Sequence, residues 1–126
     1  MFSHVTIGTH DLERAIRFYD ATLSELGINQ VPKKYSNWAA WQREGEPQKF
    51  WVGDPNNGLP ASWGNGCMVA FSAPSREAVE RAYAAAIAAG GRDEGPPGLR
   101  KSYGPDYYGA YVRDPDGNKI HFVHRG

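Results

Sequence analysis

The stretch that decides the fold is YYGAYVRDPDGNKIHFVH, residues 107–124. Its two ends favour β-structure, and five turn residues, 114–118, separate them. Pro115 presets a φ angle that suits a turn, and Gly117 can take the positive φ that closes a bulged hairpin. The stretch therefore predicts a β-hairpin.

A second pair of β-like segments lies earlier in the chain, at 37–43 and 49–52, with turn residues between them. Aligning the two hairpins places residues 49–52 on residues 119–122. The sequence thus contains two hairpins of similar design.

Two segments have apolar residues at the three- and four-residue spacing of an amphipathic helix. The first runs from Leu12 to Leu26 and the second from Val79 to Ile87. Asp11 and Ser75 are the expected N-caps, and glycine follows each segment. Each segment therefore predicts one helix between a strand and a hairpin.

A short alternating strand precedes each helix, at 4–7 and at 68–71. A shift of 64 positions places Val5 on Val69 and Gly27 on Gly91, so strand, helix and terminating glycine repeat together. The sequence predicts an α+β protein made of two strand–helix–strand–strand–strand units. We expect the units at about 1–53 and 67–126, with a linker at about 54–66 and an irregular segment, suited to binding loops, at 95–105.

Composition excludes several classes of function. Lys plus Arg and Asp plus Glu are both 14, so the basic excess of a typical nucleic-acid-binding protein is missing. The single cysteine, Cys67, rules out an internal disulfide framework. The longest apolar run, 82–89, is too short to span a bilayer, and the first residues do not resemble a signal peptide. We expect a cytoplasmic protein with no nucleic-acid or membrane partner.

Strand alternation assigns residues to two faces. The helix-facing set is Val5, Ile7, Phe50, Val52, Val69, Phe71, Ile120 and Phe122. The opposite set is His4, Thr6, Trp51, Met68, Ala70, His121 and Val123. A curved sheet with histidine, tryptophan and methionine on its concave side suits a ligand cavity.

These features resemble the vicinal oxygen chelate superfamily, the glyoxalase, bleomycin-resistance and extradiol dioxygenase group. The resemblance rests on the paired units, the opening strand His4-Val5-Thr6-Ile7 and the closing run 107–120 with its Asp-Pro-Asp-Gly-Asn turn. It implies a fold of two βαβββ modules that form a cupped mixed sheet, with the helices on the convex face. It also implies a small-molecule substrate or ligand and a homodimer; whether one chain or two complete the cup stays open.

In metal-dependent members of that group, ligands come from four positions that correspond here to His4, Trp51, Met68 and His121. Tryptophan is no ligand and a thioether is a poor one for hard ions, so the resemblance leaves His4 and His121 as metal ligands. The candidate metals are Zn, Ni, Mn and Fe, and a protein without a metal is an open alternative. Trp51 and Met68 then serve packing or substrate contact.

Four aromatic or basic residues near the irregular segment complete the candidate site. Arg100 suits an anionic group, and Tyr103, Tyr107 and Tyr111 suit an aromatic wall, although tyrosines at strand edges are often only surface residues. The candidate substrate-binding set is Trp51, Met68, Arg100, Tyr103, Tyr107 and Tyr111; no catalytic residue is identified.

Two functions fit these residues. The first is a glyoxalase- or dioxygenase-related enzyme, metal-dependent through His4 and His121, of lyase or dioxygenase type. The second is a metal-free protein that binds or sequesters a small molecule, as bleomycin-resistance proteins do.

Overall fold

The structure is a computed structural model that describes residues 1–33 and 35–126. The first module contains β1 (His4–Gly8), α1 (Leu12–Leu23), the short 3₁₀ helix η1 (Ser24–Leu26), β2 (Ile28–Gln30), β3 (Trp38–Arg43) and β4 (Lys49–Gly53). The second contains β5 (Val69–Ser72), α2 (Arg76–Ala88), β6 (Arg92–Leu99), the 3₁₀ helix η2 (Lys101–Tyr103), β7 (Tyr107–Arg113) and β8 (Lys119–Arg125). The predicted α+β class with two βαβββ modules is confirmed.

The strands form two four-stranded mixed sheets with matching topology, in the orders β1-β4-β3-β2 and β5-β8-β7-β6. In the first sheet β1 runs parallel to β4 with Val5 opposite Phe50. In the second β5 runs parallel to β8 with Val69 opposite Ile120. The pairing of Val5 and Val69 at equivalent positions confirms the repeat predicted from the sequence.

Both helices begin at the predicted caps. A side-chain oxygen of Asp11 accepts a hydrogen bond from the Arg14 backbone N–H, and Ser75 accepts one from Ala78 N–H. The helical segment of the first module closes through η1 at Gly27, whose φ of 76° is left-handed and suits glycine.

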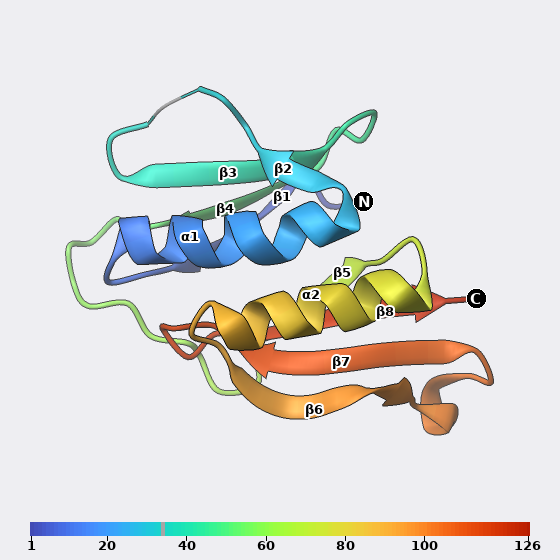
Figure 1. The fold of residues 1–126 in the computed structure, drawn as a ribbon. Helices are drawn as coiled ribbons and strands as arrows, with labels where there is room; N and C mark the ends of the chain where they lie inside the picture. Colours follow the sequence, from blue (N-terminus) through green and yellow to red (C-terminus); the bar gives the residue numbers. More distant parts are fainter. Residues whose placement is uncertain (34) are drawn as a thin grey trace.

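The two helices lie side by side (Figure 1), and the apolar faces of both sheets contribute to one core. The residues predicted to face the helices all belong to this core or pack against it. Phe50 of β4 meets Phe71 of β5 edge to face, with ring centroids 4.9 Å apart. This aromatic contact joins the modules, whose strands belong to different sheets.

The segment 95–105 is more regular than its sequence suggests. β6 covers its first five residues and pairs with β7, but the register shifts between Asp93 and Gly95 and again between Gly95 and Gly98. Pro96 and Pro97 lie in the second shift, where they have no N–H to donate to a ladder. The expectation of an irregular segment is therefore wrong for 95–99.

In the part of the chain that the structure describes, no helix combines the length and hydropathy that crossing a bilayer requires.

Candidate functional site

The candidate site lies on the face of the second sheet that points away from its helix; we call it the outer face. In β7 and β8, Val112, Ile120 and Phe122 are fully buried in the core. Alternation therefore places Tyr107 and Tyr111 of β7, and Lys119 and His121 of β8, on the outer face. Tyr111 lies directly opposite His121 in the antiparallel pair.

His121 is fully buried although it lies on the outer face. Its ring stacks on Tyr111 with centroids 3.9 Å apart and planes 7° apart, and on Tyr107 at 5.7 Å. Gly109 makes room for it, because a Cβ there would lie 2.5 Å from the His121 Cε1 atom. The two tyrosines and the glycine therefore fix the plane of the imidazole.

Both ring nitrogens of His121 have partners in the protein. Nδ1 lies 2.9 Å from the Ala110 carbonyl oxygen, and because that oxygen only accepts, Nδ1 carries the proton. Nε2 lies 2.7 Å from the Tyr107 hydroxyl, which donates to its lone pair in the neutral ring. The hydrogen bonds thus define one neutral tautomer.

The surroundings of His121 favour this neutral form. Burial lowers the pKa of His121 below its ordinary value, the charges of Arg100, Lys119 and Arg125 lower it further, and the bond to Ala110 opposes them in part. The Arg100 guanidinium lies 5.5 Å and the Lys119 ammonium 5.2 Å from the centroid of the Tyr111 ring. The outer face therefore combines aromatic rings with positive charge.

A cavity of about 400 Å³ opens beside Tyr111. It is lined by Met68, Glu94, Arg100, Ser102, Tyr103, Tyr111 and Lys119. Glu94 is paired with Arg113 at 3.0 Å, so Arg100 and Lys119 leave the lining with a net positive charge. Volume and lining suit a small ligand, for which pockets of roughly 300–1,000 Å³ are typical.

The structure therefore brings together four of the six residues predicted to bind substrate: Met68, Arg100, Tyr103 and Tyr111. Tyr107 adjoins them, with its ring 5.3 Å from that of Tyr103. Trp51 lies in the other sheet, half-buried, against the ring of Tyr35 at 5.1 Å, and does not line this cavity.

His4 is exposed on β1, where its Nδ1 lies 3.0 Å from the Ser3 hydroxyl. No hydrogen bond described for residues 1–33 and 35–126 joins His4 to His121. His4 and Trp51 also differ in register, because Lys49 lies opposite His4 and Trp51 lies opposite Thr6.

The donor set does not fit a divalent metal ion. Among the described residues, no group of three or more His, Cys, Asp or Glu side chains is placed to hold one. The only lone pair of the His121 ring already accepts from Tyr107. Met68 is exposed and offers a thioether, which is a poor ligand for hard ions.

Three lining residues, Glu94, Ser102 and Lys119, were not predicted from the sequence. For Lys119 the signal was present, since alternation from His121 places it on the same face. Glu94 and Ser102 reach the cavity through the bulged course of β6 and through η2, which no periodicity in the sequence indicates.

Three comparisons bear on this geometry. A family model described as Glyoxalase/Bleomycin resistance protein/Dioxygenase superfamily matches residues 1–122. The crystal structure of a glyoxalase/bleomycin resistance protein from Albidiferax ferrireducens T118 is 44% identical, with a TM-score of 0.89 over 100% of this chain and 99% of that one. A search of curated proteins found no match.

More distant structures share the fold alone. A glyoxalase/bleomycin resistance protein/dioxygenase family enzyme from Burkholderia phytofirmans PsJN is 19% identical, with a TM-score of 0.77 over 98% of each chain. A glyoxalase-related enzyme from Fulvimarina pelagi is 21% identical, with a TM-score of 0.76 over 98% of this chain and 87% of that one.

Proposed function

The chain belongs to the Glyoxalase/Bleomycin resistance protein/Dioxygenase superfamily, and from the geometry of its site we propose that it binds a small anionic aromatic molecule without a metal ion. The proposed site is the cavity beside Tyr111, on the outer face of the second sheet. Arg100, Tyr103, Tyr107, Tyr111 and Met68 are the proposed ligand-binding residues, together with Lys119.

The observation that carries the proposal is the bonding of His121. Both of its ring nitrogens are engaged, with Ala110 and with Tyr107, and its ring lies between two tyrosines. The imidazole thereby supports the aromatic wall of the cavity rather than presenting a free ligand atom. A ligand ring can pack against Tyr103, and its anionic group can reach Arg100 or Lys119, which both lie over the ring of Tyr111.

The positively charged residues that line the cavity determine the charge expected of the ligand. Arg100 already donates to the Pro96 carbonyl at 2.8 Å, which holds its guanidinium near the cavity. Lys119 forms no ion pair with any side chain described in 1–33 and 35–126. A carboxylate is thus attracted by two cations, and a neutral analogue of the same shape is not.

The test is a calorimetric or NMR titration with benzoate and with benzamide, its neutral analogue. We expect benzoate to bind more tightly, and Arg100→Gln and Lys119→Gln each to weaken its binding about fivefold, roughly 1 kcal/mol. Arg17→Gln removes the same charge from an exposed position on α1 and should have no effect. Equal affinity for both probes, or unchanged benzoate affinity in both site variants, would refute an anionic ligand.

A second candidate is the metal-dependent enzyme, of lyase or dioxygenase type, with His4 and His121 as ligands. It is favoured by one observation: a neutral imidazole whose Nδ1–H is held by a carbonyl is the arrangement common behind metal-bound histidines. Protein without an affinity tag, titrated with Mn²⁺, Fe²⁺, Ni²⁺ and Zn²⁺, tests it. Stoichiometric binding with a rise in melting temperature would favour this function over the metal-free one.

We also infer that the protein forms a homodimer. β1 and β5 are edge strands, each hydrogen-bonded to one neighbour, and Met68 just before β5 is exposed. Unpaired edges and exposed apolar side chains favour association. Light scattering after size-exclusion chromatography should give twice the chain mass, and a monomer at tens of micromolar would contradict the inference.

A further inference from the structure

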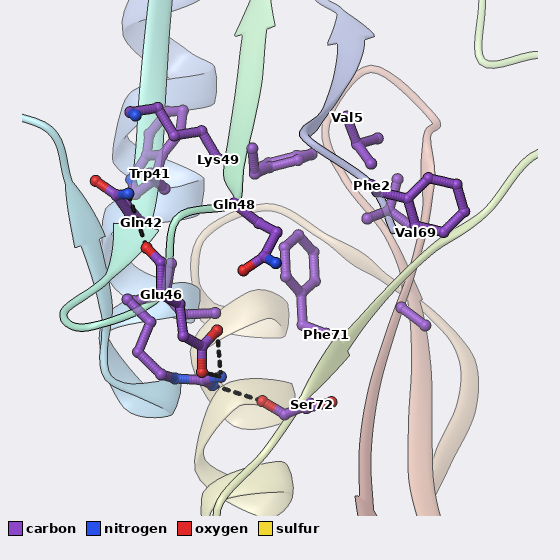
Figure 2. A pocket seen from close by; sticks show the side chains of 14 residues that line it. Phe2, Val5, Trp41, Gln42, Glu46, Gln48, Lys49, Val69, Phe71 and Ser72 are labelled. Atoms are coloured by element: carbon purple, nitrogen blue, oxygen red, sulfur yellow. Dashed lines mark hydrogen bonds and ion pairs between the residues drawn. The ribbon is translucent and has the colours of Figure 1, made fainter.

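A second cavity lies between the two modules and shares no lining residue with the site above. Its volume is about 280 Å³. Its apolar walls come from both modules: Val5 and Trp41 from the first, Val69 and Phe71 from the second (Figure 2). Phe50 of the first module also lines it. These residues belong to the core or pack against it, whereas Phe2, Glu46 and Gln48 of the lining are exposed, so the cavity is a partly open cleft at the edge of the core.

Arg43 is one of the lining residues of the cavity and bonds to both modules. Its guanidinium donates to the Leu26 carbonyl at 2.9 Å in the first module and to the Ser72 carbonyl at 2.6 Å in the second. It also pairs with Glu46 at 3.2 Å. The charges of Arg43 and Glu46 therefore offset one another, and the guanidinium is occupied by protein acceptors.

One neutral polar group near the apolar wall is the amide of Gln48. Figure 2 shows the side chain of Gln48 beside the ring of Phe71. No hydrogen bond is described for the Gln48 amide, which can both donate and accept. The cavity thus offers an aromatic floor with the exposed Gln48 amide beside it as a neutral hydrogen-bonding group.

We propose that this intermodule cavity binds a small uncharged molecule with one aromatic ring and one hydrogen-bonding head group. Its volume is just below the range of about 300–1,000 Å³ usual for ligand pockets, which limits the ligand to about one ring. Its apolar walls favour an aromatic ring, which would bury apolar surface and pack against Phe50 or Phe71. The head group contacts Gln48, and a charged head finds no free partner in Arg43 or Glu46, because these two side chains already pair with each other.

Benzyl alcohol and toluene are the probes, followed by ¹H–¹⁵N NMR titration of the whole chain. We expect saturable binding of both, with shifts in residues around Phe50 and Phe71. Gln48→Ala should weaken benzyl alcohol binding by about two- to tenfold, the effect of one hydrogen bond, and leave toluene binding unchanged. Lys49→Gln, which removes a charge from a lining residue, should leave both unchanged.

Filling the cavity gives the steric test. Val69→Phe and Val5→Phe each add a ring from a different wall of the cavity. Either substitution should abolish binding of both probes. Circular dichroism identifies the variant that keeps the wild-type fold, and binding is measured on that variant. Val31→Phe adds the same volume outside the cavity and serves as the control. Absence of saturable binding, shifts confined to the region of Tyr103 and Tyr111, or tighter binding of benzoate than of benzyl alcohol would overturn the proposal.

The proposals for the two sites can be refuted independently of each other. Arg100→Gln should weaken benzoate binding on the outer face and leave benzyl alcohol in the intermodule cavity untouched. If Arg100→Gln weakens benzyl alcohol binding equally, both probes occupy the outer face and the intermodule site is refuted.

Discussion

The Tyr107 hydroxyl lies 2.7 Å from Nε2 of His121. Nδ1 of that ring donates to the Ala110 carbonyl, so in the neutral ring Nε2 has only a lone pair, the tyrosine donates and the imidazole accepts. The oxygen of Tyr107 then keeps its lone pairs for other partners, and the lowered pKa of His121 favours this neutral ring. The contact between β7 and β8 therefore fixes Tyr107 as the hydrogen-bond donor and His121, 14 positions later in the chain, as the acceptor.

Tyr107→Phe should raise the pKa of His121 toward its ordinary value. The substitution removes the donor that favours the lone pair on Nε2, and hence the neutral ring. NMR of ¹⁵N-labelled protein should show wild-type His121 protonated at Nδ1 alone, and a pH titration should give the higher pKa in the variant.

Tyr103→Phe is the matched control, because Tyr103 is 68% exposed and no contact with His121 is described for it. A wild-type ring protonated at Nε2, or a pKa of His121 that Tyr107→Phe does not raise, would contradict the hydrogen-bond assignment.

The lowered pKa of His121 also predicts how stability depends on pH. The folded state disfavours the charged ring, so the unfolded state binds the proton more readily below about pH 6.5. The contribution of His121 to the free energy of unfolding is thus complete above that pH and declines as the pH falls. Urea unfolding at pH 7.5 and 5.5 measures it.

His10→Gln removes an exposed histidine and should keep the wild-type pH dependence, whereas His121→Gln should reduce it. Identical slopes in these two variants would show that His121 is not the titrating group.

The fold could be predicted because each local signal agreed with the others. Asp11 and Ser75 cap the helices, Gly117 closes the turn with a φ of 90°, and apolar alternation fixes the helix-facing side of each strand. β2 was not located from the sequence because three residues are too few to show the two-residue period of a strand. β6 was not located because its prolines and shifted register hide its apolar alternation.

The site could be predicted only in part. Aromatic and basic residues near 100–111 could be named, since their types alone suggest binding. The bonding of His121 could not, because it depends on the register that brings Tyr107 and Ala110 to its two nitrogens. The intermodule cavity could not either, because it arises from how two modules pack and from no pattern within either of them.

Asp114→Asn should destabilise the fold by about 2–4 kcal/mol. The Asp114 carboxylate accepts from the Tyr19 hydroxyl at 2.5 Å, from the Asn118 side chain, and from backbone N–H groups of Asp116 and Asn118. Asparagine replaces one carboxylate oxygen by an NH₂ group. That group would face one of these donors and leave it without an acceptor. Urea denaturation measures the loss.

Tyr19→Phe removes one of those donors and leaves the other three, so its cost should be smaller, about 1–2 kcal/mol. Burial raises the pKa of Asp114 while Tyr19 and Asn118 lower it, so Tyr19→Phe should raise that pKa further. A cost of Asp114→Asn below that of Tyr19→Phe would show that the network is not centred on Asp114.

Arg43 should stabilise the packing of the two modules, since it bonds carbonyls of both. Arg43→Met leaves the Leu26 and Ser72 oxygens without these donors and should cost about 2–3 kcal/mol in the free energy of unfolding. Arg43→Lys keeps the charge but not the planar fork, and should recover only part of that loss. Glu46→Gln is the control: it removes only the half-exposed ion pair at 3.2 Å and should cost about 0.5 kcal/mol or less. If Arg43→Met and Glu46→Gln cost the same, the contribution of Arg43 is its surface ion pair and not its bonds across the module boundary.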